Sequence, residues 1–316
     1  MINSPICEAV GIKYPIFQGG MAWIADGKLA AAVSNAGGLG IISAMNADSD
    51  YLREQIKIAK AATDKPFGVN IMLQSPHAEE VAKVVAEEKV PVVTTGAGSP
   101  SKFMEMWIEA GIKVIPVIAS VSMAKKMEKC GATAVVAEGQ ESGGHIGELT
   151  TMAIVPQVVD AVNIPVIAAG GIGDGRGVAA AFMLGASGVQ LGTRFLVAKE
   201  CGVHQNYKDA VIKATDISTA TTGRRFGGNT CRGIKNAFTR NFIKEEYAPE
   251  ANSETVANLG VGALRKAAVE GDVKNGSVLA GQISGLITKE QTAEEIITEI
   301  FTQAEELLGG ASKWVK

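Results

Sequence analysis

Short apolar runs recur along the chain, separated by segments whose apolar residues follow a helical period. The runs are rich in Val and Ile and show no alternation of polar and apolar positions, as is typical of parallel strands covered on both faces. Amphipathic segments such as Asp50–Ala62 and Glu79–Glu88 lie between them. The pattern predicts eight strands, at Pro15–Gln18, Gly40–Ser43, Phe67–Ile71, Val92–Thr95, Val114–Val117, Ala134–Ala137, Val166–Ala169 and Gly188–Leu191.

The spacing of these strands predicts the fold class. Each strand begins about one βα unit after the previous strand, with room for only short loops between them. Eight such units in a row predict an α/β protein built as a (β/α)8 TIM barrel. A doubly wound parallel sheet is the alternative, but it would use fewer strands and a switch point in their order.

The pattern changes after the eighth strand, which divides the chain into three predicted parts. Residues 1–197 would form the barrel core. Residues 198–250 show no clear periodicity and are interpreted as an inserted substrate-binding or lid segment over the barrel mouth. Residues 251–316 contain two predicted helices, Ser253–Glu270 and Thr292–Leu308, which would close the barrel.

Composition and charge exclude several classes of protein. The 316 residues are 47% hydrophobic and 20% charged, which is typical of a soluble globular protein with a large core. The net charge of −3 argues against a general nucleic-acid binder. The cysteines are scattered, so we expect no metal site, no disulfide and a reducing cytoplasm. With no signal peptide and no apolar run suited to a bilayer, we expect no membrane association.

The segment Ala137–Met152, which follows the sixth predicted strand, carries the most distinctive chemistry. It is rich in glycine, which allows a backbone to approach a ligand closely, and it contains His145, a candidate proton donor. A mobile surface loop with an incidental histidine is the alternative interpretation of these residue types. The position of the segment at the carboxyl end of a barrel strand favours a functional site.

The loops after the seventh and eighth strands predict a phosphate site. The backbone amides near Gly171 and Gly173, with those of Gly192 and Thr193, would surround an anion where TIM barrels commonly bind phosphate. Tight turns alone are the alternative explanation of these glycines.

A phosphate site, together with polar groups at other strand ends, suits flavin mononucleotide (FMN). The flavin ring would lie on the Gly19–Ala22 segment, and Asn70 would hydrogen-bond its polar edge. Asn70 is equally well explained as a plain strand-end cap.

Five motifs together resemble those of the nitronate monooxygenase-like flavoproteins, the family of 2-nitropropane dioxygenase. Within this family, the His145 loop and its continuation to Met152 are similar to those of the bacterial enoyl-acyl-carrier-protein reductases II. The similarity runs from about residue 5 to Gln282, and the His145 loop is its most specific part. The five motifs are Gln18–Met21, Gly68–Asn70, Thr95–Gly98, Glu141–His145 and Gly170–Gly173.

The resemblance implies an oxidoreductase that binds FMN, takes electrons from NADH or NADPH and reduces trans-2-enoyl groups on acyl carrier protein. It also implies a homodimer and stimulation by a monovalent cation. His145 would be the catalytic residue, which either protonates the substrate or polarises its carbonyl. The implied FMN contacts are Gly20, Met21, Ala22, Asn70, Gly96, Glu138, Gly171, Gly173, Gln190, Gly192 and Thr193.

A basic stretch lies within the inserted segment. Between Ile217 and Lys244 the chain has six basic residues and no acidic residue. A positive rim there would steer an acidic carrier protein to the site or bind a nucleotide phosphate, with Arg224 and Arg225 as the candidate contacts. The alternative is a solvated insertion whose charges pair within a dimer.

Other functions fit parts of the pattern. A nitronate monooxygenase would use the same FMN with oxygen as acceptor, although the Ile146–Thr151 continuation favours the reductase. A flavin-free TIM-barrel isomerase would need only the phosphate-binding loops. A barrel dehydrogenase of the inosine-monophosphate type needs a nucleophilic cysteine beside the phosphate site, and none occurs between Cys130 and Cys201.

Overall fold

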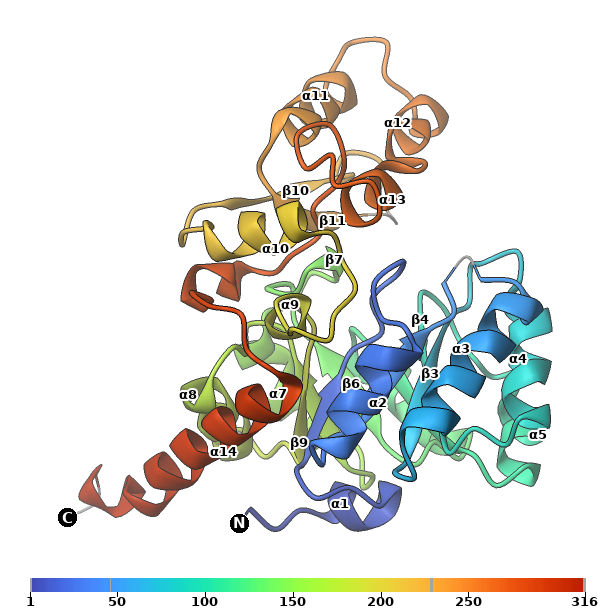
Figure 1. The fold of residues 1–316 in the computed structure, drawn as a ribbon, viewed down its shortest axis with the longest axis vertical. Helices are drawn as coiled ribbons and strands as arrows, with labels where there is room; N and C mark the ends of the chain where they lie inside the picture. The colour runs from blue at the N-terminus through green and yellow to red at the C-terminus, as the bar shows by residue number, and fades with distance from the viewer. Residues whose placement is uncertain (1, 46, 228–229, 315–316) are drawn as a thin grey trace.

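Parallel strands form a barrel in the computed structural model, which describes residues 2–45, 47–227 and 230–314 (Figure 1). The hydrogen-bonded order is β1-β9-β8-β6-β5-β4-β3-β2, and a parallel bridge between Phe17 and Leu39 joins β1 to the start of β2. The predicted (β/α)8 TIM barrel is therefore confirmed. Its strands are β1 (Ile16–Gln18), β2 (Gly40–Ser43), β3 (Phe67–Met72), β4 (Val92–Gly96), β5 (Lys113–Ile118), β6 (Val135–Glu138), β8 (Val166–Ala169) and β9 (Gly188–Leu191).

Helices surround these strands. Most of them directly follow a strand, but α14 comes from the end of the chain and packs between α8 and α2, where it completes the ring. A capping box of Thr292 and Glu295 starts α14. Within the described ranges, none of the helices combines the length and apolar character needed to cross a bilayer. The barrel helices are α2 (Gly27–Asn35), α3 (Ser49–Ala62), α4 (Ala78–Glu87), α5 (Met104–Glu109), α6 (Val121–Lys129), α7 (Thr151–Val159), α8 (Gly175–Met183) and α14 (Ala293–Gly309).

Two apolar clusters explain why the strands lack alternation. One cluster fills the barrel interior and includes Phe17, Ile115 and Ile167, and helix α1 (Pro5–Val10) covers the amino-terminal end of the barrel with Ile6. The other cluster lies between the strands and the outer helices. Because both faces of each strand are buried, both faces are apolar. The carboxyl ends of the strands are left free to carry polar loops.

A second lobe stands beyond the carboxyl ends of the strands (Figure 1). It holds an antiparallel sheet of order β10-β11-β7, in which β7 belongs to the loop after β6. After the lobe, the chain returns to the barrel through a short 3-10 helix, η1. These elements are β7 (Gly144–His145), α9 (Thr193–Leu196), α10 (Gln205–Ile212), β10 (Thr219–Thr222), β11 (Cys231–Ile234), α11 (Ala237–Glu246), α12 (Ser253–Gly260), α13 (Ala263–Ala268) and η1 (Gln282–Leu286); a final 3-10 turn, η2 (Ala311–Trp314), follows α14.

The lobe extends beyond the predicted insertion 198–250. The segment expected to be one helix closing the barrel is two helices, because Gly262 adopts a φ of +72° between α12 and α13. Helix α12 packs against α11, and α13 against α12. The predicted boundary at residue 250 therefore falls inside the lobe, and α14 is the helix of the last part that closes the barrel.

Candidate active site

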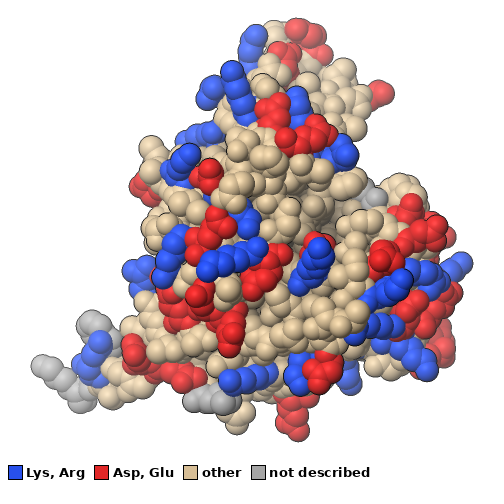
Figure 2. All heavy atoms as spheres, viewed as in Figure 1, with Lys and Arg blue, Asp and Glu red and all other residues tan. Residues whose placement is uncertain are grey.

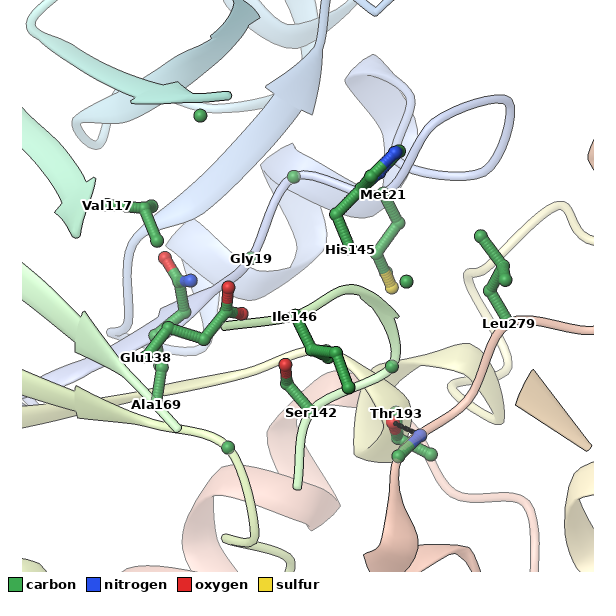
Figure 3. Close-up of a pocket in the computed structure, with 18 of the residues that line it drawn as sticks. Gly19, Met21, Val117, Glu138, Ser142, His145, Ile146, Ala169, Thr193 and Leu279 are labelled. Atoms are coloured by element: carbon green, nitrogen blue, oxygen red, sulfur yellow. Dashed lines mark hydrogen bonds between the residues drawn. The ribbon is translucent and has the colours of Figure 1, made fainter. Parts of the chain in front are cut away.

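A cavity of about 460 Å³ opens between the carboxyl ends of the barrel strands and the lobe, and its volume is typical of a small-molecule site. The loops after β1, β3, β4, β6, β8 and β9 form its floor and sides. Tyr207 and Leu264 contribute from the lobe side, as does Leu279 (Figure 3). Most residues predicted for the site line this cavity: His145, Gly20, Met21, Ala22, Asn70, Gly96, Glu138, Gly171, Gln190, Gly192 and Thr193.

Three predicted site residues, Gly173, Arg224 and Arg225, are not among the residues that line the cavity. A Cβ on Gly173 would lie 3.3 Å from the Ile283 side chain, so this glycine allows η1 to pack closely. The guanidinium Nη1 of Arg225 donates to the carbonyl oxygens of Glu246 (2.9 Å) and Ala248 (2.8 Å). Arg225 therefore caps the carboxyl end of α11, whereas Arg224 remains exposed on the lobe.

His145 lies on β7, where the loop after β6 joins the lobe sheet. Its side chain is exposed at the mouth of the cavity, yet partial desolvation by the surrounding loops lowers the pKa of its imidazole below the ordinary value. No described residue hydrogen-bonds its ring. At neutral pH the ring is therefore predominantly neutral and can offer one N–H to a ligand.

Four backbone amides at the ends of β8 and β9 form a cradle for an anion. Gly171, Ile172, Gly192 and Thr193 line the cavity, and none of their N–H groups donates a hydrogen bond within the described residues. The only atom within 4 Å of a Cβ built on Gly192 would be Met21 Sδ, at 3.9 Å, so the space in front of it is open. Unpaired amides in neighbouring loops beside an open space suit a phosphate group.

The floor of the cavity brings Gly20 and Asn70 together. A Cβ on Gly20 would lie 2.3 Å from the Asn70 Cβ, so only glycine allows the β1 loop to cross the end of β3. The Asn70 amide Nδ2 donates to Thr94 Oγ1 over 2.9 Å, which fixes its orientation. The close approach of Gly20 and the fixed Asn70 amide make a polar floor that suits the edge of a flavin ring.

Glu138 ends β6 and points into the cavity (Figure 3). Burial raises the pKa of its carboxyl group to about 7. The group is therefore partly protonated at neutral pH and can donate or accept a hydrogen bond.

Replacing Glu138 by Gln should flatten the pH dependence of stability in the flavin-free protein. The pKa of Glu138 is raised in the folded state, so between the ordinary carboxyl pKa and about 7 the folded protein binds more protons than the unfolded chain. The free energy of unfolding therefore falls as the pH rises through that window. A neutral amide removes this loss, which amounts to roughly 2–3 kcal/mol. Melting temperatures measured between about pH 5 and about pH 8 should fall less in Glu138→Gln than in the wild type. Parallel curves would contradict this account.

The structure adds cavity residues that the sequence did not single out. The Ser142 hydroxyl is buried in the cavity wall, where it makes no hydrogen bond of normal geometry to the described residues but lies close enough to Glu138 to lower the pKa of that carboxyl, against the larger effect of burial. The Glu141 carboxylate accepts hydrogen bonds from Thr151 N and Oγ1, at 2.9 and 3.0 Å, and holds the start of α7. Both lie in the His145 motif, whereas the apolar lobe residues Leu264 and Leu279 carry no sequence signal.

The family model described as nitronate monooxygenase matches residues 3–88 and 78–303. The chain belongs to the nitronate monooxygenase family. Among solved structures, this family member is similar to FabK from Thermotoga maritima, with a TM-score of 0.97 and 47% identity over 100% of both chains. A probable nitronate monooxygenase from Staphylococcus aureus (strain N315) is 34% identical, with 96% of this chain and 98% of that protein covered.

The name of a third similar protein describes a dehydrogenase whose substrate is a coenzyme A thioester. It is (3aS,4S,5R,7aS)-5-hydroxy-7a-methyl-1-oxo-octahydro-1H-indene-4-carboxyl-CoA dehydrogenase from Mycobacterium tuberculosis (strain H37Rv), which is 33% identical over 100% of this chain and 99% of its own. The family consists of FMN-dependent flavoproteins, and this member is an FMN-dependent oxidoreductase. The amide cradle and the Gly20–Asn70 floor fit that cofactor. No cluster of three or more metal-binding side chains occurs among the residues that the structure describes.

Proposed function

We propose that this protein is an enoyl-acyl-carrier-protein reductase of bacterial fatty-acid synthesis that uses NADH or NADPH. The observation that carries the proposal is the similarity to FabK, an enoyl-acyl-carrier-protein reductase II of the kind that the His145 loop resembles, since that structure matches the whole chain at 47% identity. The relatives named as probable nitronate monooxygenases reach 34%. The His145 loop, which resembles that of the reductases II, lies over the cavity. We expect a cytoplasmic homodimer, stimulated by a monovalent cation.

Bound FMN would supply hydride transfer between the nicotinamide nucleotide and the substrate. The amides of Gly171, Ile172, Gly192 and Thr193 would hold its phosphate, and the floor around Gly20 and Asn70 would hold its ring. These groups are in place before binding, so little reorganisation is needed.

His145 would act on the substrate. When the β-carbon of an enoyl thioester accepts a hydride, negative charge develops on the thioester oxygen, and the α-carbon then takes a proton. A neutral imidazole at the cavity mouth can donate an N–H hydrogen bond to that oxygen, whereas the imidazolium form, which takes a proton from solvent, can transfer that proton to the α-carbon and return to the neutral form. The apolar side chains of Ile146, Leu264 and Leu279 would exclude water from the acyl chain.

An anaerobic assay with crotonyl-CoA tests the proposal. The purified yellow protein should oxidise NADH or NADPH and convert crotonyl-CoA to butyryl-CoA in equal amounts. If neither nucleotide supports product formation, the proposed reaction is wrong.

A nitronate monooxygenase is the second candidate, favoured by the family match and by the Staphylococcus aureus relatives. It would consume oxygen and a nitronate without any nicotinamide nucleotide. The substrate of this reaction has no acyl thioester chain for the apolar side chains of Ile146, Leu264 and Leu279 to cover.

Replacing Arg224 by Glu should weaken the use of carrier-linked substrate. Arg224 is exposed on the lobe, where it lies close enough to Arg232 to lower the pKa of that residue. Lys and Arg side chains also project from the upper part of the molecule, interspersed with acidic side chains (Figure 2). Charge reversal should raise the KM for an enoyl-carrier protein by about 3- to 10-fold, because an acidic partner loses attraction.

The KM for the uncharged crotonyl thioester of N-acetylcysteamine should stay the same in Arg224→Glu. Lys125→Glu, which reverses an exposed charge on α6, is the matched control and should leave both constants unchanged. An Arg224→Glu variant with normal kinetics on the carrier-linked substrate would exclude docking at this residue. Arg225→Glu is a poor test, since it would remove the cap of α11.

A further inference from the structure

The position of His145 depends on the lobe. Strand β7 pairs antiparallel with β11, so that His145 faces Cys231 and Gly144 faces Arg232. The pairing continues where the Ile146 N–H donates to the Thr230 carbonyl oxygen over 3.0 Å. The histidine that meets the substrate is therefore on the edge strand of a sheet whose other strands belong to the lobe.

Arg232 is the side chain of β11 that reaches back across the His145 loop. It is only 6% exposed, and its Nε donates to the Gln140 carbonyl oxygen over 3.1 Å while Nη1 approaches Thr219 Oγ1 at 3.3 Å. Its backbone pairs with Gly144 at the other arm of the loop. One residue thus holds both arms of the 140–144 loop.

The Arg232 guanidinium is buried between an opposite charge, Glu141, and a like charge, Arg224. Burial and the nearby charge of Arg224 lower its pKa, whereas the Glu141 carboxylate acts in the opposite direction. Burying a guanidinium without partners is costly, so its contacts to the loop are needed to keep it in place. The Glu141 carboxylate is itself fixed by the start of α7.

The other contacts from outside the loop hold it at Glu141: the Gln282 N–H donates to the Glu141 carbonyl oxygen over 2.9 Å, and Thr151 binds the Glu141 carboxylate. Gly143 and Gly144 have no side chains, and Gly144 adopts a φ of +79°. The loop's own backbone hydrogen bonds are Ser142 N to Gly139 O (3.2 Å) and, at its neck, Gln140 N to Leu149 O (2.8 Å). Since no described residue hydrogen-bonds the His145 ring, its direction follows the backbone that carries it.

We propose that Arg232 is a positioning residue for His145, which holds the histidine loop against the lobe sheet so that the imidazole meets the substrate. The inference rests on the proposed function in one respect, namely that His145 acts on the substrate. An error of about 1 Å in the position of a catalytic group can cost about 100-fold in rate. Arg232 would set the rate through the loop, without touching cofactor or substrate.

A double-mutant cycle tests the proposal, with holoenzyme variants Arg232→Met, His145→Ala and the double variant. Arg232→Met should lower kcat by about 10- to 100-fold with unchanged KM for the nicotinamide nucleotide and unchanged flavin content. In the His145→Ala background the same change should cost less than about 2-fold, because the group that it positions is absent. Arg232→Lys, which keeps the charge and a donor, should recover part of the rate. Arg53→Met, a matched loss of arginine on α3, should change nothing.

Hydrogen exchange gives a readout that is independent of turnover. Peptides covering 140–146 should exchange faster in Arg232→Met than in the wild type, whereas those of α8 should not change. If Arg232→Met does not fold, the cycle and the exchange measurement are made with Arg232→Lys, for which a smaller but still non-additive loss is expected.

Equal losses in the two backgrounds, or no loss of kcat in a folded Arg232 variant, would overturn the proposal. Failure of the proposed function is a separate outcome, because the wild type itself would not reduce crotonyl-CoA. In that case the cycle is measured with a nitronate and oxygen, and unchanged exchange of the loop would still overturn the positioning role.

Discussion

Replacing His145 by Ala is expected to lower kcat by roughly 100- to 10,000-fold. His145 is the only histidine among the described residues that line the cavity, and desolvation lowers its pKa, so the wild-type ring is a neutral N–H donor at neutral pH. A donor aimed at charge that develops in the transition state contributes mainly to kcat. The alanine variant loses that donor but keeps the amide cradle and the floor.

Flavin absorbance and the Kd for FMN should therefore be unchanged in His145→Ala. His77→Ala is the matched control, since His77 is half-buried at the start of α4 beside Glu80, is not among the residues that line the cavity, and should be dispensable. Normal turnover by His145→Ala would remove the histidine from the mechanism. Loss of flavin from this variant would mean that its ring holds the cofactor instead.

Replacing Gly192 by Asp is expected to weaken FMN binding by at least about 100-fold, because the new carboxylate repels the phosphate and keeps it from the amides, whose hydrogen bonds to a charged group contribute roughly 1.5–3 kcal/mol each. The backbone itself tolerates the change. Gly192 has a φ of −105°, and its Cβ would meet only Met21 Sδ, at 3.9 Å. The variant should therefore fold and purify without colour.

Circular dichroism and FMN titration check this prediction. Gly309→Asp is the control, since a Cβ there has no neighbour within 4 Å and the residue ends α14. A yellow Gly192→Asp protein with normal FMN affinity would mean that the phosphate lies elsewhere.

The barrel could be predicted from the sequence because its signals are local. Each strand is a short apolar run buried on both faces, so its type can be recognised without knowledge of its partners. The end of α14 is likewise predicted by two consecutive glycines, Gly309 and Gly310, which favour the end of a helix. The same locality explains why the strand ends, and hence the loops that carry Gly20, His145 and Gly192, could be assigned to one site, whereas Glu138 is implied by the family resemblance.

The lobe could not be predicted because its order comes from partners distant in the sequence. Strands β10 and β11 are short, with half-buried positions and little apolar pattern, and they are stabilised by pairing with each other and with β7. The role of Arg225 depends on two carbonyl groups, of Glu246 and Ala248, that lie at and just beyond the carboxyl end of α11. Leu264 and Leu279 become cavity residues only when the lobe returns over the barrel.

The most direct test of the central claim follows the reduced flavin. The protein is reduced with NADH or NADPH without oxygen and then mixed either with crotonyl-CoA, still anaerobically, or with a nitronate and air. Rapid reoxidation by crotonyl-CoA with formation of butyryl-CoA, and no nitronate-dependent oxygen uptake, is the predicted result. A flavin that stays reduced in crotonyl-CoA, in a protein that consumes oxygen with the nitronate, would contradict the reductase and identify a nitronate monooxygenase.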